Sequence, residues 1–334
     1  MSGDRAQARR RTGKPPEAAL FDAQGTPPGS LAACLSLPGL TIAVTGMDAG
    51  WQQEFLETYG VHAHPGARPG AQASGGGAVC TLATARSATV DHFITPPAPG
   101  TIEYVPLFIE VKPEVGAAGH WIVRACSYDI ALSLATATAS GTLLVSGAAF
   151  EPRSRGVENM LRVAVAWMAR SLGGMLIHAA SIVWQDRGYT FFGASGAGKS
   201  TVAASTRRGQ VVSDDLSLLL PEEQTGVPSG LSLVGTPFRG TWTGGPQVTG
   251  RWPLAAAFHL NKAAPFQTPR ATPMTPARAM AAMTGNLPFV VDQLAAHPGL
   301  MAGIEKALRP IPAFELVFRK DDDSYWEAIT AAGL

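Results

Sequence analysis

The stretch Gly193–Thr201 has residue types and a spacing that suit the binding of a phosphate chain. It reads Gly-Ala-Ser-Gly-Ala-Gly-Lys-Ser-Thr and fits the pattern G-x-x-x-x-G-K-[S/T] at every fixed position. Its glycines can take positive φ, so that successive N–H groups turn toward a single anion. Lys199 supplies a positive charge for the β- and γ-phosphates, and the Ser200 hydroxyl is a ligand for Mg²⁺. The predicted phosphate-binding residues are Gly193, Ala194, Ser195, Gly196, Ala197, Gly198, Lys199, Ser200 and Thr201.

Two adjacent acids, Asp214 and Asp215, follow the apolar run that begins at Gln210. This is where a carboxylate that serves the metal of a nucleotide site would stand, since Mg²⁺ is usually held by one or two carboxylates together with phosphates. Successive side chains on a strand face opposite ways, but a twist or bulge can turn both toward one site. We expect one aspartate to be a metal ligand and the other to accept a proton from the group that receives the phosphate. The spacing alone does not say which is which.

Two further residues are candidates for catalysis. His178 lies within an apolar run, where a histidine is either a satisfied core residue or, if its strand neighbours the phosphate loop, a group near the phosphates or the acids. Arg239 lies in Gly-Thr-Pro-Phe-Arg-Gly, a segment shaped by glycine and proline. Its planar guanidinium suits a phosphate, although an exposed arginine in a turn would look the same.

The elements around the loop are those that a phosphate site requires. Residues 175–184 and 189–192 are predicted to form a β-hairpin that delivers the chain to the loop, with a turn at 185–188. Residues 201–208 are predicted to form the helix that follows, and 210–220 a second strand. A hairpin before the loop is unusual for nucleotide-binding proteins in which strands and helices alternate. Further along, helices are predicted at 289–296 and 300–308.

The predicted fold class is α/β, with a mixed α+β sheet and three parts. Residues 1–30 form a disordered tail rich in Pro, Gly and Arg, and residues 31–152 a mainly β N-terminal domain. Residues 153–334 form the phosphate-binding domain, which opens with an amphipathic helix over 153–172 that has Ser154 as its N-cap.

Composition excludes several classes of function. The chain has 334 residues and a net charge of +1, with 15% charged residues, which predicts neither nucleic-acid binding nor attachment to a membrane surface. The uncharged run 130–150 is about as long as a membrane span, but its Thr, Ser and Gly content favours a hairpin that turns near 139–141. Three scattered cysteines and the lack of an apolar N-terminal run favour a reducing compartment, which we expect to be the cytoplasm.

These motifs in this order resemble the catalytic domain of HPr serine kinase/phosphorylase. The likeness rests on Ile177-His178-Ala-Ala-Ser, a short hairpin, the phosphate loop, a helix and Val-Val-Ser-Asp-Asp. It is closer for the related bacterial proteins that carry Gly-Thr-Pro-Phe-Arg-Gly downstream. The signature segment of the bifunctional enzymes is not found, and the first half does not match the usual N-terminal domain of the family.

The resemblance implies a core like that of phosphoenolpyruvate carboxykinase, ATP with Mg²⁺, and transfer to a serine hydroxyl. Lys199 and Ser200 would bind phosphate and Mg²⁺, Asp214 would be the base, Asp215 a metal partner, and His178 would contact the phosphate region.

The leading hypothesis is therefore an ATP-dependent kinase that phosphorylates a hydroxyl, most simply a serine, of a small protein or peptide. In it, Arg239 steadies the transferring group. Two alternatives stay open: a kinase for a small metabolite with the same site, and a regulatory module that binds ATP without transfer. The sequence is compatible with a homo-oligomer.

Overall fold

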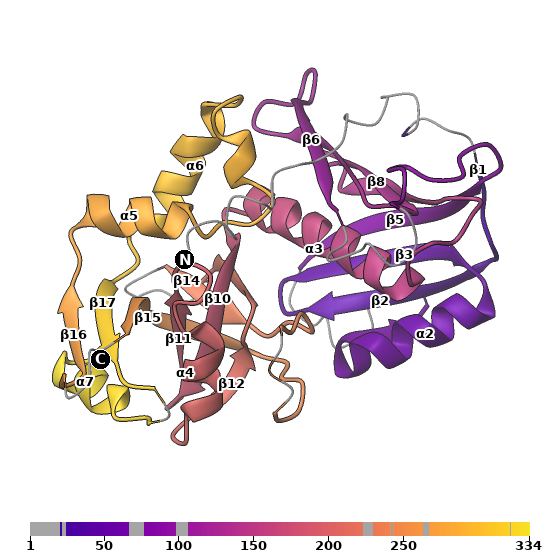
Figure 1. The fold of residues 1–334 in the computed structure, drawn as a ribbon. Helices are drawn as coiled ribbons and strands as arrows, with labels where there is room; N and C mark the ends of the chain where they lie inside the picture. Colours follow the sequence, from indigo (N-terminus) through magenta and orange to yellow (C-terminus); the bar gives the residue numbers. More distant parts are fainter. Residues whose placement is uncertain are drawn as a thin grey trace. The chain divides into compact units, whose positions relative to one another are not determined.

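The computed structural model describes residues 21, 25–66, 77–97, 106–222, 230–240, 242, 244–262, 267–320 and 322–334. The chain divides into two compact units, of which the second comprises Leu37–Gly39 and Ala169–Leu334 and the first comprises the remainder. The boundary therefore lies near the end of the helix that was predicted to open the second domain, not at residue 152. The fold is mixed α/β, with one mixed sheet in each unit (Figure 1).

The first unit is built on a nine-stranded sheet, counted over its described residues. The strand order is β4-β2-β3-β5-β9-β8-β7-β6, and β1 pairs with β5. The pairs β3–β5 and β5–β9 are parallel, whereas the pairs β1–β5, β2–β4, β6–β7, β7–β8 and β8–β9 are antiparallel. The strands are β1 (Gly25–Thr26), β2 (Leu31–Leu37), β3 (Leu40–Met47), β4 (Ala63–Pro65), β5 (Ala78–Ser87), β6 (Phe108–Pro113), β7 (Trp121–Cys126), β8 (Ile130–Ala135) and β9 (Ser140–Val145).

Two helices complete the first unit. Helix α2 (Ala49–Tyr59) is capped by Asp48, whose carboxylate accepts the N–H of Trp51, and it buries Trp51, Phe55 and Tyr59 at a spacing of four residues. Sequence analysis did not predict this helix; it is followed by the short 3₁₀ turn η2 (Gly60–His62). Helix α3 (Arg153–Ser171) begins at Arg153, so the prediction of Ser154 as its N-cap was wrong.

Two predictions for the first unit have clear outcomes. Most of the predicted tail lies outside the described residues, but Phe21 is buried and Gly25–Thr26 pairs with β5, so this part of the tail is ordered. The uncharged run 130–150 contains the antiparallel pair β8–β9, which confirms the hairpin. Among the described residues, no helix is long and apolar enough to cross a membrane.

The second unit carries an eight-stranded sheet in its described residues. Its order is β11-β10-β13-β14-β15-β17-β16, with β12 beside β10 and an additional pairing of β11 with β15. The strands are β10 (Met175–Trp184), β11 (Arg187–Phe192), β12 (Gln210–Ser213), β13 (Leu216–Pro221), β14 (Leu231–Val234), β15 (Arg251–Lys262), β16 (Arg270–Pro273) and β17 (Ala313–Phe318). The helices are α4 (Lys199–Ser205), α5 (Pro276–Thr284), the 3₁₀ turn η3 (Val291–Gln293), α6 (Gly299–Leu308) and α7 (Tyr325–Ala331).

The predicted hairpin before the phosphate loop is confirmed. Strands β10 and β11 pair antiparallel up to Trp184 and Arg187, and the two turn residues between them have φ of 50° and 56°. Two successive positive φ values are typical of a type I′ turn, which matches the twist of the strands. Strand β11 then pairs in parallel with β15. The residue that precedes the loop is therefore held between two strands.

Strand β10 changes partners along its length. Its first half, through His178, pairs with β13, and its second half pairs with β11 and β12. The predicted strand 210–220 is accordingly split into β12 and β13, with Asp214 and Asp215 at the break.

A hydrophobic core secures α4 against the sheet. Val202 and Ala203 of α4 pack in one cluster with Phe191, Phe258 and Trp326. This packing fixes the position of α4, the helix that follows the loop. Of the helix predicted over 289–296, only the short 3₁₀ turn η3 forms, whereas α6 confirms the helix predicted over 300–308.

Candidate active site

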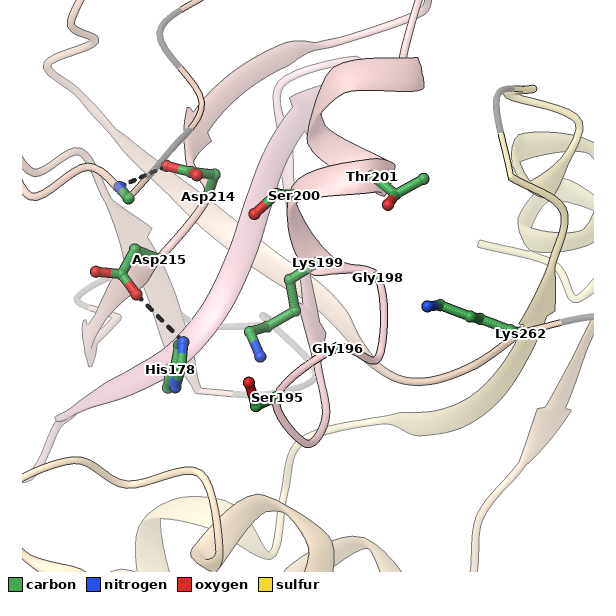
Figure 2. Close-up of a pocket in the computed structure, with 11 residues that line it drawn as sticks. His178, Ser195, Gly196, Gly198, Lys199, Ser200, Thr201, Asp214, Asp215 and Lys262 are labelled. Atoms are coloured by element: carbon green, nitrogen blue, oxygen red, sulfur yellow. Dashed lines mark hydrogen bonds and ion pairs between the residues drawn. The ribbon is translucent and has the colours of Figure 1, made fainter. Parts of the chain in front are cut away.

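One pocket of about 350 Å³ gathers most of the predicted site residues of the second unit (Figure 2). It contains both aspartates and His178, together with most of the phosphate loop. Its lining is formed by His178, Ser195, Gly196, Gly198, Lys199, Ser200, Thr201, Asp214, Asp215, Gly240 and Lys262. Residues that are far apart in sequence thus line the same pocket, and the loop contributes the largest group of them.

The loop is held in a conformation that only glycine adopts easily. Gly193, Gly196 and Gly198 have φ of 153°, 80° and 110°. A Cβ on Gly198 would overlap the ring of Phe318 in β17, and one on Gly193 would lie 2.9 Å from the Cβ of Ala197. A Cβ on Gly196 would meet nothing within 4 Å. The loop therefore packs against the sheet beneath Gly198 and leaves open space above Gly196, on the side where a phosphate would bind.

Lys199 is buried and points back into its own loop. Its Nζ donates to the carbonyl oxygens of Gly193 at 2.9 Å and Ala194 at 3.4 Å. Burial lowers the pKa of the Lys199 ammonium, while the nearby Asp215 carboxylate opposes this shift. Three loop residues do not line the pocket: Gly193, Ala194 and Ala197. The carbonyl oxygens of Gly193 and Ala194 accept the hydrogen bonds from Lys199, and the N–H of Ala197 donates to the carbonyl oxygen of Ala194.

Asp214 is buried and both of its carboxylate oxygens accept backbone N–H groups. Oδ1 accepts from Gly240 at 2.8 Å and Oδ2 accepts from Trp242 at 2.9 Å. The preceding Ser213 donates to the carbonyl oxygen of Phe238 at 3.1 Å. Asp214 and Ser213 therefore hold the Gly-Thr-Pro-Phe-Arg-Gly segment against the break between β12 and β13. This contact places Gly240 in the lining of the pocket.

Asp215 faces a different group. Its Oδ1 lies 3.2 Å from Nε2 of His178, and both side chains are partly exposed, 24% and 39% respectively. The backbone supports this pair from both sides, because Ala179 N–H donates to the Asp215 carbonyl at 3.0 Å and His178 N–H donates to the Asn286 carbonyl at 2.8 Å. Figure 2 shows the imidazole and the Lys199 ammonium entering the pocket from neighbouring elements.

Arg239 is not part of the pocket lining. Its Nη1 donates to the carbonyl of Gly245 at 2.9 Å, and its guanidinium lies 6.0 Å from the ring centre of Trp242. In this conformation the guanidinium group interacts with residues of its own loop. The structure therefore brings His178, Lys199 and the two aspartates together but leaves Arg239 outside.

Two lining residues were missed by sequence analysis, Gly240 and Lys262. Gly240 belongs to a segment that was singled out for its arginine, and its place follows from the N–H that it donates to Asp214. Lys262 is the last residue of β15, a strand whose central residues are apolar and buried. No local signal marks this lysine, because its proximity to the loop depends on the parallel pairing of β15 with β11.

The side chains present fit Mg²⁺ together with a phosphate ligand. The oxygen donors are the Ser200 hydroxyl and the paired carboxylates, which are hard ligands of the kind that Mg²⁺ prefers. Among the described residues, no group of three or more His, Cys, Asp or Glu side chains could hold a metal alone. Mg²⁺ in proteins typically takes its remaining ligands from phosphates and water.

Neither the models of known protein families nor the curated proteins contain a match to this chain. Function is therefore inferred from the residues of the site.

Proposed function

We propose that this protein is an ATP-dependent kinase whose second unit is a phosphate-loop core of the HPr kinase type. It would transfer the γ-phosphoryl group to a hydroxyl, most simply a serine, of a small protein or peptide. The observation that carries the proposal is the shared pocket, in which a complete G-x-x-x-x-G-K-S loop faces two carboxylates and a histidine. Phosphoryl transfer needs these parts: a cradle for the donor phosphates, a cation, and a group that takes the proton of the acceptor.

The loop and its lysine would bind the phosphate chain. The Lys199 ammonium donates to two loop carbonyls, so its side chain is held at the loop, within reach of phosphate oxygens that would bind there. A bound phosphate would replace those weaker partners with a charge-assisted hydrogen bond. Mg²⁺, held by Ser200 and a carboxylate of the pair, would neutralise phosphate charge when bound.

The contacts favour Asp215, not Asp214, as the group that accepts the proton. Both oxygens of Asp214 already accept backbone N–H groups, and its side chain is buried. Asp215 is more exposed and has His178 beside it. This assignment reverses the roles that the family resemblance implies for the two aspartates.

The transfer balances with these groups alone. The acceptor oxygen forms a bond to the γ-phosphorus while the bond from that phosphorus to the β–γ bridging oxygen breaks and ADP leaves. The hydroxyl proton passes to the Asp215 carboxylate, whose charge His178 steadies from 3.2 Å.

The proposal is tested first by binding and then by transfer. Titration calorimetry should show that the wild-type chain binds ATP with Mg²⁺ and that Lys199→Met weakens binding or transfer by at least about 100-fold. Lys306→Met, an exposed lysine on α6, is the matched control and should behave as wild type. A wild-type chain that binds no ATP would refute the proposal.

The acceptor is identified with γ-labelled ATP. Label that enters a protein or peptide fraction supports the proposed acceptor class, whereas label found only in small molecules favours the metabolite kinase. ATP binding without any transfer by the wild-type chain would leave the regulatory module as the better account. In that case Asp215→Asn would change neither binding nor any effect on a partner.

A further inference from the structure

Lys262 is a second cation at the phosphate loop, and its surroundings indicate what it would bind. It lines the same pocket as the loop and is exposed at the carboxyl end of β15. Among the described residues, its ammonium has no ion-pair partner, unlike the exposed Lys112, which pairs with Glu110 at 3.1 Å. A lysine beside a phosphate-binding loop with no carboxylate to neutralise it is suited to bind an anion.

The sheet register places Lys262 beside the loop. Phe192, the residue before the loop, pairs with His259, and Lys262 pairs with Phe318. The ring of Phe318 packs directly beneath Gly198. The end of β15 therefore runs alongside the loop, held between the strand that enters the loop and the strand that supports it.

Strand alternation sets the face on which Lys262 projects. Side chains two residues apart share a face, so Lys262 is on the same face as Phe258 and Leu260. Those two residues pack in the cluster that includes Val202 and Ala203 of α4. Lys262 thus continues the face that carries α4 and reaches the pocket from that side. Figure 2 shows its ammonium directed at the loop, on the side opposite to His178 and the two aspartates.

We propose that Lys262 binds the part of the phosphate chain nearest the nucleoside. This inference rests on the proposed function, in which the γ-phosphate faces the aspartates. If that end of the chain lies toward Asp215, the α-phosphate end lies on the opposite side of the loop, where Lys262 is. Lys199 would then bind the β- and γ-phosphates, and Lys262 would bind the phosphate chain near the α-phosphate.

These two binding positions predict how substitution of Lys262 changes the affinities for ATP and for ADP. A contact near the α-phosphate is present in both ATP and ADP, whereas a contact to the γ-phosphate is present in ATP alone. Lys262→Met should therefore raise the dissociation constants of ATP and of ADP by a similar factor, about tenfold for a charge-assisted hydrogen bond. Lys262→Arg keeps the charge and should recover most of the affinity.

Titration calorimetry with ATP and ADP on the full chain tests this pattern, with Lys306→Met as the control. A loss with ATP alone would overturn the proposal and place Lys262 at the γ-phosphate. Unchanged affinity for both nucleotides would overturn it as well. These outcomes differ from failure of the proposed function, in which the wild-type chain itself binds neither nucleotide. Circular dichroism of each variant shows whether a loss comes from unfolding.

Discussion

Asp214 and Asp215 are neighbours in sequence but have different surroundings. Asp214 accepts two backbone N–H groups and holds a loop, while Asp215 faces an imidazole and a buried ammonium. The difference arises because the pair lies at the break between β12 and β13, where the chain turns one side chain toward Gly240 and the other toward His178. One acid therefore holds a loop in place, and the other is the acid that we propose as the proton acceptor.

Substitution by asparagine should separate these two roles. In Asp214→Asn the amide group can accept from only one of the two N–H donors, so the variant should lose about 1–3 kcal/mol of stability. Asp215→Asn should keep its stability within about 1 kcal/mol but lose about 100-fold or more in transfer rate. Urea denaturation and a labelled-ATP assay measure the two effects. Equal loss of stability in both variants would contradict the distinction.

At the scale of elements, the phosphate loop depends on its support from the sheet. Strands β11, β15 and β17 lie in register beneath it, and the Phe318 ring fills the space under Gly198. The hairpin β10–β11 brings His178 to the same edge. The loop geometry is thus a property of these strands as well as of its glycines.

A matched pair of alanine substitutions tests this support. Gly198→Ala must adopt positive φ and also overlap Phe318, whereas Gly196→Ala has the φ strain alone. Both should lose roughly 1–2 kcal/mol from φ strain, and Gly198→Ala a further 1–3 kcal/mol or so from overpacking. Urea unfolding of the two variants compares the losses. Greater destabilisation of Gly196→Ala would contradict the packing of Phe318 beneath Gly198.

The first unit holds a buried acid that should make its stability depend on pH. Burial raises the pKa of Glu151, although hydrogen bonds from Ser127 and Asp129 oppose the shift. The folded chain therefore binds this proton more tightly than the unfolded chain does. Stability should rise as the pH falls through the folded pKa toward the usual carboxyl range, below which the gain is complete.

Glu151→Gln removes this titration. Between about pH 8 and about pH 5, the stability of the wild-type chain should therefore increase relative to that of the variant. Urea midpoints at the two pH values give the comparison, and Glu57→Gln, an exposed substitution on α2, serves as its control. A difference that does not change with pH would show that Glu151 does not titrate in this range.

At the scale of the whole molecule, all three cysteines are buried and free. Burial raises the pKa of Cys34, and it raises the pKa values of Cys80 and Cys126 to about 12. Each thiol should therefore stay protonated and unreactive near pH 8. A disulfide reagent should label none of them in the folded chain and three after unfolding in urea. Rapid labelling of one thiol in the folded chain would contradict this burial.

The local parts of the site can be predicted from the amino-acid sequence alone. The loop pattern, the hairpin before it, the helix after it and the adjacent acids follow from glycine, turn and periodicity signals that act over a few residues. Helix α2 was missed even though Asp48 caps it, because its apolar stripe is only three residues.

How these parts are brought together in one pocket depends on long-range contacts in the fold. The break between β12 and β13 and the arrival of Lys262 result from pairing between distant strands, and the hydrogen bond from Gly240 to Asp214 joins residues 26 positions apart. These contacts join segments far apart in the chain, and no short window of sequence contains both partners. The candidate site residues could therefore be predicted from the sequence, whereas the contacts that distinguish Asp214 from Asp215 could not.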